Sequence, residues 1–417
     1  MDNLPVSWAE KRLREITTKP QYGYTASASA HKKGPKFVRI TDITKENVNW
    51  ETVPYCECSR EIFQKYKLEL KDLLFARTGS TGSSILITNL PEPAVFASYL
   101  IRLKIKKGIE AEYLNHFFKS WFYWKQIESL KVGAVQSGIN ASVLASLKIP
   151  VPPLVEHRGI VEVLGTVDEC IRLTDAVIER AEELKRGLMQ QLLTRGIGHT
   201  EYKETQLGKI PKTWKISTFG KECNIGTGGT PRRNRPDYYN GNIPWVKSTE
   251  LDYGIIFDTE EHISKRALEE SNAKIYPTGT LLIAMYGLEA VGTRGRCAIL
   301  GVDAATNQAI AAIQPKKQIL PRFLYYYYQQ MGNLIMKYAE GTKRKNLSLS
   351  IIKKIPIIVP PITEQGKIVN IIENQDDIIN LENQKINQLN TLKQGLIQLL
   401  LSGKTRVELK GDGLHRI

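Results

Sequence analysis

The strongest constraint on the fold of this chain is an internal repeat at a constant offset of 208 residues. Leu147–His157 matches Ile355–Gln365, and Leu184–Leu193 matches Leu392–Leu401. Solenoid units span only about 20 to 50 residues, so a repeat of this length indicates a duplicated domain pair. The expected molecule is therefore pseudo-twofold, with a separate core in each half.

The correspondence continues upstream of these stretches, although more loosely. The matching segments are Pro5 and Trp8 with Pro211 and Trp214, Phe37–Ile43 with Trp245–Leu251, and Leu73–Ala76 with Leu281–Ala284. Each half is therefore predicted to be one variable globular block followed by one more regular helix.

Each predicted helix begins just after a Pro-Pro pair, which fixes an extended entry and lets a helix start beyond it. Apolar residues then recur every three or four positions, as in the seam of a coiled coil, with interruptions at Thr174, Gln375 and Glu382. About 34 residues per helix give a rod of roughly 50 Å at 1.5 Å per residue. Because each helix starts from its own block, antiparallel pairing of the two copies is the simplest closure.

The globular blocks carry short β-rich runs separated by Gly, Pro and Asn turns. In the first block these runs are Lys36–Ile43, Leu73–Arg77, Ser84–Thr88 and Tyr99–Ile105. One aromatic-rich stretch per block, Glu112–Leu130 and Pro321–Ala339, is predicted to be helical. The expected fold class is α+β, with two pseudo-symmetric α/β blocks separated by two long antiparallel coiled-coil helices.

Consecutive aromatic residues at 121–124 and 325–328 allow two interpretations. Aromatic faces can stack on exposed bases, which would make these runs part of a nucleic-acid site. Neighbouring residues on a helix, however, spread around its circumference. We therefore expect most of these rings to pack into the core of their own block.

The charge balance favours a polyanionic partner, most simply nucleic acid. The formal net charge is +15, although many basic proteins never touch DNA. No stretch approaches the roughly 18 consecutive apolar residues of a membrane span, and the first residues resemble neither a secretory nor a transit signal. Five cysteines, an odd number without metal-site spacing, favour a reducing compartment. The chain is expected to be soluble and cytoplasmic, with no bound metal.

Motifs that resemble catalytic or cofactor loops are incomplete. Ser402–Thr405 contains the Gly-Lys-Thr of a phosphate-binding loop, but Gln398 stands where the first glycine is required and the segment follows a helix. Gly226–Pro231 lacks the dinucleotide-binding spacing and is interrupted by proline, so a mobile loop is one interpretation. Because the loop runs into Arg232, Arg233 and Arg235, a contact with phosphate or a base is the other. No residues for catalysis are visible, and no cofactor is expected in this chain.

Two loops at matching places in the blocks differ in chemistry. Residues 343–345 are basic, whereas residues 133–138 are uncharged and rich in hydrogen-bonding groups such as Gln136. Either loop is compatible with simple exposure to solvent. Arg and Lys, however, pair with guanine and Gln or Asn with adenine in the major groove, so unequal loops suit two readers of different sequences.

The chain resembles the specificity subunit of type I restriction–modification systems over nearly its whole length. Gly228–Pro231 followed by Tyr238–Val246 is similar to the opening of a target recognition domain, and the Pro-Pro entry to each long helix resembles the family's spacer. The first block departs from this pattern, because Lys19–Tyr24 stands in place of the Gly-Gly-Thr-Pro loop.

The resemblance implies target recognition domains at 1–150 and 206–358, with helical spacers at 151–200 and 359–408. It further implies a bipartite, asymmetric double-stranded DNA target whose gap the helices measure. The implied partners are two modification subunits carrying S-adenosylmethionine and, further, restriction subunits that use ATP and Mg²⁺, so these cofactors belong to the partners. The residues selected as DNA contacts are Arg39, Thr41, Arg77, Ser80, Gln136, Arg232, Arg233, Lys247, Lys343 and Arg344.

Two other classes of function remain open at this point. One is a scaffold whose coiled coil binds partner proteins and whose charge is incidental. The other is an enzyme with an unrecognised site, which requires activity in the isolated chain. Matching loops of different chemistry in two otherwise similar blocks favour a protein that recognises two different half-sites, since a symmetric scaffold has no evident need for such a difference.

Overall fold

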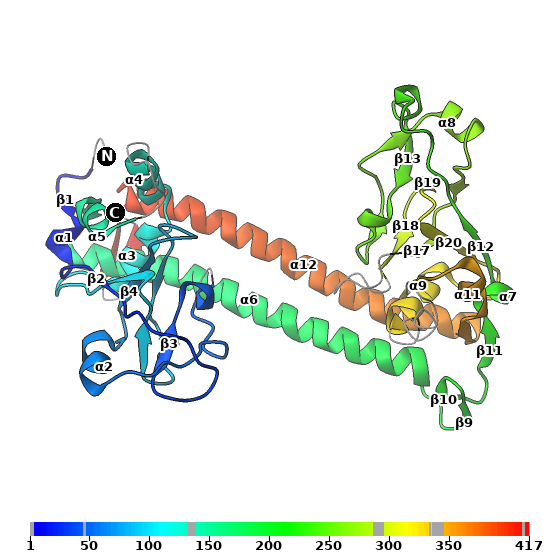
Figure 1. The fold of residues 1–417 in the computed structure, drawn as a ribbon, viewed down its shortest axis with the longest axis horizontal. Coiled ribbons are helices and arrows are strands. Elements are labelled where there is room, and N and C mark those ends of the chain that lie inside the picture. The colour runs from blue at the N-terminus through cyan, green and yellow to red at the C-terminus, as the bar shows by residue number, and fades with distance from the viewer. Residues whose placement is uncertain are drawn as a thin grey trace. The chain divides into compact units, whose positions relative to one another are not determined.

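The computed structural model describes residues 4–44, 47–131, 139–286, 296–332, 335, 346–410 and 413–416. The chain forms two compact units, here called unit 1 (Met1–Ala176 with Asn383–Ile417) and unit 2 (Val177–Glu382) (Figure 1). The division passes through both long helices. Each unit therefore combines one globular block with part of each helix.

Unit 1 contains a four-stranded sheet in the order β2-β7-β4-β5, a parallel pair β3-β6 and an antiparallel pair β1-β8. The strands are β1 (Ala9–Arg12), β2 (Gln21–Tyr22), β3 (Lys36–Val38), β4 (Leu73–Ala76), β5 (Ser84–Leu86), β6 (Ala94–Phe96), β7 (Leu100–Leu103), β8 (Lys148–Val151), β22 (Val407–Lys410) and β23 (Gly413–Arg416). The short helices are α1 (Leu13–Ile16), the 3-10 turn η1 (Ile40–Asp42), α2 (Arg60–Tyr66), α3 (Ala111–Phe118), α4 (Trp121–Lys131) and α5 (Ala141–Ser146).

Unit 2 contains a five-stranded sheet β12-β20-β17-β18-β14, a four-stranded sheet β15-β13-β19-β16 and the pairs β11-β21 and β10-β9. The strands are β9 (Tyr202–Thr205), β10 (Gly208–Pro211), β11 (Lys215–Thr218), β12 (Cys223–Thr227), β13 (Ile243–Val246), β14 (Ile255–Ile256), β15 (His262–Ile263), β16 (Ile275–Tyr276), β17 (Leu281–Ala284), β18 (Cys297–Leu300), β19 (Ala304–Thr306), β20 (Ile310–Pro315) and β21 (Pro356–Val359). The short helices are α7 (Phe219–Glu222), η2 (Pro236–Tyr238), η3 (Ser248–Glu250), α8 (Lys265–Glu269), α9 (Pro321–Gln330) and α11 (Leu349–Lys354).

Two long helices, α6 (Leu154–Arg195) and α12 (Ile362–Leu401), follow the Pro-Pro pairs. They are longer than expected, at 42 and 40 residues, because each continues to just before a glycine with positive φ, Gly196 (+67°) or Gly403 (+69°). An L side chain rarely adopts this conformation, so the glycine ends the helix. Gly403 thus places Ser402–Thr405 at a helix end, as expected from the sequence.

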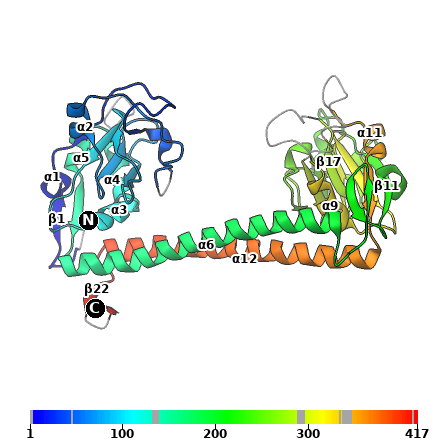
Figure 2. The same ribbon diagram turned by 90° about the horizontal axis from the view of Figure 1, so that it is seen from below.

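The helix segments pack antiparallel within each unit (Figure 2). In unit 1, Lys393 of α12 pairs with Asp168 of α6 at 2.5 Å. In unit 2, Lys185 of α6 pairs with Asp376 of α12, also at 2.5 Å. These two ion pairs are repeat equivalents. The expected fold class of mixed α/β blocks with an antiparallel helix pair is confirmed.

The start of each long helix is fastened by a glutamate to its block. Glu156 of α6 accepts hydrogen bonds from Trp8 Nε1 at 2.9 Å and from two guanidinium nitrogens of Arg406 at 2.6 and 2.8 Å. We call this group the Glu156 clasp. The clasp ties the beginning of α6 to the segment that follows α12.

The Glu364 clasp is its repeat equivalent in unit 2. Glu364 of α12 accepts from Trp214 Nε1 at 2.9 Å and from the backbone N–H of Ile197 at 3.0 Å, and it lies 2.7 Å from His199 Nε2. An imidazole therefore stands in unit 2 where unit 1 has a guanidinium.

The stretch Glu112–Leu130, predicted to be helical, is helical except at Lys119 and Ser120, which separate it into two helices, α3 and α4. Ser120 Oγ donates to the carbonyl of Phe117 at 2.6 Å and accepts from the backbone N–H of Tyr123 at 3.3 Å. Such local bonding competes with the helical pattern and begins a new helix.

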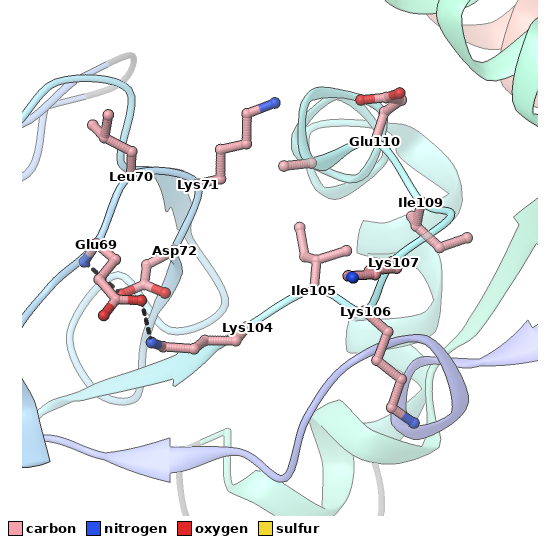
Figure 3. Close-up of a pocket in the computed structure, with 11 residues that line it drawn as sticks. Glu69, Leu70, Lys71, Asp72, Lys104, Ile105, Lys106, Lys107, Ile109 and Glu110 are labelled. Carbon is pink, nitrogen blue, oxygen red and sulfur yellow. Dashed lines mark hydrogen bonds and ion pairs between the residues drawn. The ribbon is translucent and has the colours of Figure 1, made fainter.

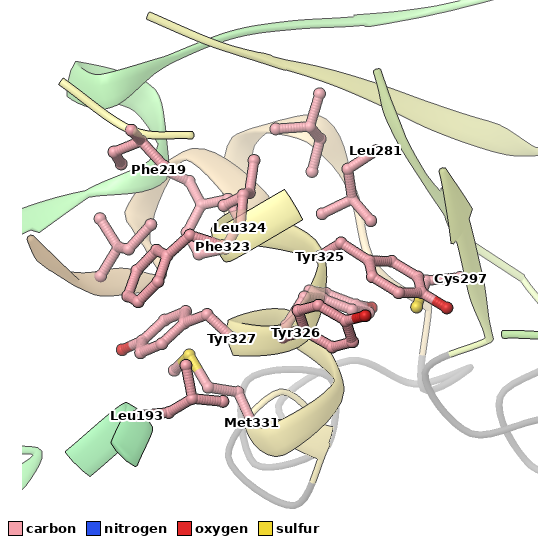
Figure 4. Close-up of a cluster of buried hydrophobic side chains, with 14 of the residues drawn as sticks. Leu193, Phe219, Leu281, Cys297, Phe323, Leu324, Tyr325, Tyr326, Tyr327 and Met331 are labelled. Carbon is pink, nitrogen blue, oxygen red and sulfur yellow. The ribbon is translucent and has the colours of Figure 1, made fainter. Parts of the chain in front are cut away.

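The second aromatic stretch forms α9 over Pro321–Gln330. All four of its consecutive tyrosines are buried, and Figure 4 shows Tyr325, Tyr326 and Tyr327 in the core of unit 2 with Phe219 and Leu281. The expectation that most of these rings form core is confirmed there. In unit 1 Tyr123 is buried as well, whereas Trp121 is 54% exposed.

The predicted strand Lys36–Ile43 is only partly a strand. β3 ends at Val38, and η1 follows because the carboxylate of Asp42 captures the backbone N–H of Arg39 at 2.8 Å. By contrast β4, a run of four apolar residues, is fully buried between β5 and β7. Within the described ranges no helix is sufficiently long and apolar to cross a membrane.

Candidate nucleic-acid interface

Arg39 and Lys247, at matching repeat positions, begin equivalent turns in the two blocks. Each follows a strand whose last two residues are buried, and each is the N-cap of a 3-10 turn, η1 or η3. The backbone N–H of Lys247 donates to Glu250 Oε2 at 2.7 Å, as that of Arg39 does to Asp42. The two blocks therefore present a basic side chain at the same point of the same frame.

These two cations are held by carboxylates of their own block. The guanidinium of Arg39 donates to both oxygens of Asp42 at 3.0 and 2.8 Å, and this hydrogen bonding raises the pKa of Arg39. Lys247 Nζ lies 2.7 Å from Glu260 and 3.0 Å from Glu261, and its pKa is raised chiefly by these hydrogen bonds. A DNA phosphate would have to compete with these partners.

Arg233 lies beside Lys247 because both pair with Glu261. Its guanidinium carbon is 4.5 Å from the ring centroid of Tyr239 and 4.9 Å from that of Trp245. The pKa of Glu261 is lowered, first by its hydrogen bond from Arg233. Two rings and a carboxylate thus position this guanidinium.

The Gly-Gly-Thr-Pro loop that carries the arginines is packed against the block, which corrects the expectation of a mobile loop. A side chain at Gly228 would collide with the backbone carbonyl of Thr306, and one at Gly229 with the backbone of Asn272 and Ala273. The Gly229 N–H donates to that same Thr306 carbonyl at 3.0 Å.

Side chains of the block complete this anchoring. Trp245 Nε1 donates to the Gly229 carbonyl at 3.0 Å, and the Tyr239 hydroxyl donates to the Pro231 carbonyl at 2.7 Å. Arg232 follows Pro231 with its side chain exposed. The loop therefore presents Arg232 from a fixed backbone.

The first block keeps the same close approach although its loop sequence departs from the pattern. A side chain at Gly23 would collide with the carbonyls of Phe96 and Ala97. The next residue, Tyr24, donates its N–H to the Phe96 carbonyl at 2.8 Å, just as Gly229 does to Thr306. Gly23 is therefore the structural equivalent of Gly228.

The ends of β4 and β17 are equivalent as well and carry different residues. The Arg77 N–H donates to the Tyr99 carbonyl at 2.9 Å, and the Met285 N–H to the Ala309 carbonyl at 2.9 Å. The guanidinium carbon of Arg77 lies 5.1 Å from the ring centroid of Tyr22. Unit 1 thus places an arginine where unit 2 has a methionine.

Three of the residues selected from the sequence, Gln136, Lys343 and Arg344, lie outside the described residues. The chain just after each of these loops is described, and it returns to the strand ends. The Ile139 N–H donates to the Arg77 carbonyl at 3.2 Å, and the Leu347 N–H to the Met285 carbonyl at 3.0 Å.

Thr41 and Ser80 are exposed. Ser80 lines a cleft of about 390 Å³ in unit 1, together with Thr44 and with Asn390 of α12.

A model of the type I restriction modification DNA specificity domain matches residues 5–183 and again 211–391. The chain belongs to this family. Each match spans one globular block and most of the helix that follows it. The internal repeat is therefore a repeat of this domain.

Relatives of known sequence are specificity subunits of type I restriction enzymes. The MjaX subunit of Methanocaldococcus jannaschii, which carries that assignment provisionally, is 26% identical over 97% of this chain and 95% of its own length. The MjaIX subunit of the same organism is 32% identical over 45% of this chain and 43% of its own. The EcoKI subunit of Escherichia coli K12 is 23% identical, covering 84% of this chain and 78% of its own.

Solved structures share the fold. One, described for complex assembly and conformational transition of the type I R-M system, has a TM-score of 0.60 at 17% identity and covers 96% of this chain and 99% of its own. The S subunit of M. genitalium has a TM-score of 0.57 at 14% identity and covers 96% of this chain and 97% of its own.

A second hollow in this member of the family, about 320 Å³ in unit 1, is lined by both signs of charge (Figure 3). Lys104 donates to Glu69 at 2.6 Å and lowers the pKa of that carboxyl.

Burial raises the pKa of Cys56, Cys223 and Cys297 to about 12, so these thiols stay protonated at neutral pH. Across the described ranges no cluster of three or more His, Cys, Asp or Glu side chains could hold a metal ion.

The residues that sequence reasoning missed are those that hold the arginines, namely Tyr22, Tyr239, Trp245 and Glu261. Tyr239 and Trp245 lie within the segment that resembles the family, so an aromatic signal was available. Tyr22 and Glu261 lie far along the chain from Arg77 and Arg233. Only the folded sheets bring these pairs together.

Proposed function

We propose that this chain is the sequence-specific DNA-binding subunit of a type I restriction–modification complex and reads a bipartite asymmetric target, one half-site per block. The observation that carries the proposal is that equivalent backbone positions in the two blocks carry different side chains. Arg39 and Lys247 occupy the same cap, and Arg77 and Met285 the same strand end. Such differences on equal backbones suit the recognition of two different base sequences.

The exposed arginines are the strongest candidates for DNA contacts within this proposal. Among the described residues no carboxylate pairs with Arg77 or Arg232, whereas Arg39, Arg233 and Lys247 pair with acids of their own block. Arg77 and Arg232 therefore reach a base or phosphate without first losing an ion pair. Thr41 and Ser80 are proposed as weaker hydrogen-bonding contacts.

The chemistry of the complex is assigned to partner subunits. In this proposal two modification subunits supply S-adenosylmethionine and methylate adenine, and restriction subunits supply ATP and Mg²⁺ chemistry in the cytoplasm. The support is that the relatives are named specificity subunits of restriction enzymes. This chain contributes recognition and docking, not catalysis.

The long helices are proposed to set the gap between the half-sites. Four residues inserted near Glu182 in α6, with four at the facing position near Ile379 in α12, lengthen the pair by about 6 Å. At about 3.4 Å per base pair the gap should widen by one to two base pairs. An unchanged gap in a variant that still methylates would exclude the helices as spacers.

The first test of the function is sequencing of methylated adenines in a methylation-free host that expresses this chain with its modification subunit. A split motif with a fixed gap, lost when either partner is omitted, is expected. No modification by a stable purified complex would favour a protein-binding scaffold. Modification without this chain would remove it from DNA recognition.

A further inference from the structure

Strand β2 of the first block places an aromatic ring against the arginine that follows β4. Tyr22 ends β2 and pairs with Ile101 of β7, whose other neighbour is β4. The chain leaves β4 at Arg77, so Tyr22 and Arg77 lie on either side of one strand. The guanidinium carbon is 5.1 Å from the ring centroid, within the range of a cation–π contact.

Tyr22 is itself held in place, although its side chain remains 39% exposed. Its hydroxyl oxygen accepts the backbone N–H of Ala141, the first residue of α5, at 3.1 Å. The ring therefore connects β2, α5 and the guanidinium of Arg77. A ring fixed at both its backbone and its hydroxyl keeps few alternative orientations.

The backbone of Arg77 is fixed on both sides of the residue. Its N–H donates to Tyr99 and its carbonyl accepts from Ile139, as described above. Only the side chain remains to be ordered, and the ring supports one face of the guanidinium. Such preorganisation lowers the entropy that a contact with DNA must otherwise cost.

The edge of this guanidinium carries two parallel N–H groups that match one base. Guanine presents its O6 and N7 acceptors side by side in the major groove, and bidentate pairing with arginine is the commonest specific contact. Arg39 directs the same edge at Asp42, at 3.0 and 2.8 Å. Among the described residues Arg77 has no such carboxylate partner.

Unit 2 lacks both members of the pair at the equivalent positions. Thr227 pairs with Ala311 of β20 where Tyr22 pairs with Ile101 of β7, and Met285 stands in the place of Arg77. The Thr227 hydroxyl donates to the Ile310 carbonyl at 2.9 Å, so it turns back to the sheet. At these equivalent positions, the arginine–tyrosine pair is therefore present in unit 1 and not in unit 2.

We propose that Arg77 reads one guanine in the half-site of unit 1 and that Tyr22 is the positioning residue that aims it. This proposal rests on the proposed DNA-reading function and names the base and the pair of residues. In unit 1 the ring of Tyr22 lies against an arginine at a strand end, whereas in unit 2 the rings of Tyr239 and Trp245 lie against the loop arginine Arg233.

The test compares methylated motifs of four variants in the complete complex. Arg77→Lys keeps the charge but loses the two parallel N–H groups of the guanidinium. The preference of the complex for guanine at one position of one half-site should therefore fall roughly tenfold or more. Tyr22→Leu should lower the preference for guanine at the same position by about two- to fivefold. Tyr22→Phe keeps the ring and should retain the wild-type motif. Arg60→Lys, on the exposed start of α2, is the matched control.

The outcomes separate this proposal from the function on which it rests. A wild-type complex without a bipartite motif contradicts the DNA-reading function itself. An intact motif in Arg77→Lys, or relaxation spread evenly over both half-sites, overturns the guanine assignment alone. If Tyr22→Phe relaxes the motif as much as Tyr22→Leu, the hydroxyl and not the ring positions Arg77, and the positioning role of the ring is wrong.

Discussion

The two units place a guanidinium against aromatic rings by different routes. In unit 1 the arginine follows the end of β4 and the ring belongs to strand β2 of the same sheet, as Arg77 on Tyr22. In unit 2 the loop supplies the arginine, and Arg233 lies over Tyr239 and Trp245. The frame is therefore conserved while the segment that carries the positive charge changes.

The same contrast extends to the helix starts. The two clasps share a glutamate and a tryptophan but differ in the third group, Arg406 or His199. The following residue differs too, because His157 occupies the place of Gln365. Two comparisons of equivalent residues follow from these differences, and a third prediction concerns Glu261 of unit 2.

The largest effect is expected at the Glu156 clasp. Glu156→Gln leaves the guanidinium of Arg406 without its carboxylate in a site where the glutamate side chain is only 3% exposed. We expect a loss of about 1 to 3 kcal/mol, since the variant removes the carboxylate that balances the charge of Arg406, whose side chain is only 29% exposed. Hydrogen exchange of the amides at the start of α6 measures it.

Glu364→Gln is the matched variant in unit 2 and should lose only about 1 kcal/mol. An amide can still hydrogen-bond an imidazole, whose ring nitrogens act as donor or acceptor. Equal losses at the two clasps would show that the guanidinium adds nothing beyond the imidazole.

The second effect concerns acid stability at His157. This ring is fully buried, neither nitrogen has a hydrogen-bond partner among the described residues, and burial lowers its pKa to about 4. An unfolded histidine titrates near 6.5, so below that pH the unfolded state takes up a proton that the folded state refuses. Stability should therefore fall as the pH drops from about 6.5 to about 4, by about 2 kcal/mol at pH 5.

His157→Gln imports the residue of unit 2, where Gln365 bonds to Leu320, Gln318 and Pro360. The variant should lack this acid-dependent loss. Urea unfolding at pH 7.5 and pH 5 measures it. A loss as large in the variant as in the parent chain would assign the pH dependence to other groups.

The smallest effect is expected at Glu261. Glu261→Gln releases Arg233 and weakens the hold on Lys247, so affinity for random-sequence DNA should rise about three- to tenfold at low salt. The slope of log affinity against log salt should steepen by about 1 to 2. Anisotropy titrations over a range of KCl concentrations measure both, with Glu269→Gln of α8 as the charge-matched control. An unchanged slope would mean that these cations do not meet phosphate.

Much of the fold follows from patterns local to the sequence. The 208-residue repeat predicts two equivalent blocks, and the 3.6-residue periodicity after each Pro-Pro pair predicts the two long helices. The break between α3 and α4 escapes this reasoning because a single side chain, Ser120, decides it. The DNA-contact roles of the ten selected residues stay predictions.

The sequence by itself determined the duplication, the antiparallel helix pair and the family, because each rests on periodicity or on matched runs of residues. Only the tertiary structure decided which basic side chains pair with carboxylates of their own block and which are exposed without such a pair among the described residues. Arg233 and Glu261 are distant in sequence, as are Arg77 and Tyr22, and their contacts depend on strand pairing. The sequence shows where the charged residues are, but the pairing of the strands decides which of them have a partner, because those partners are distant along the chain.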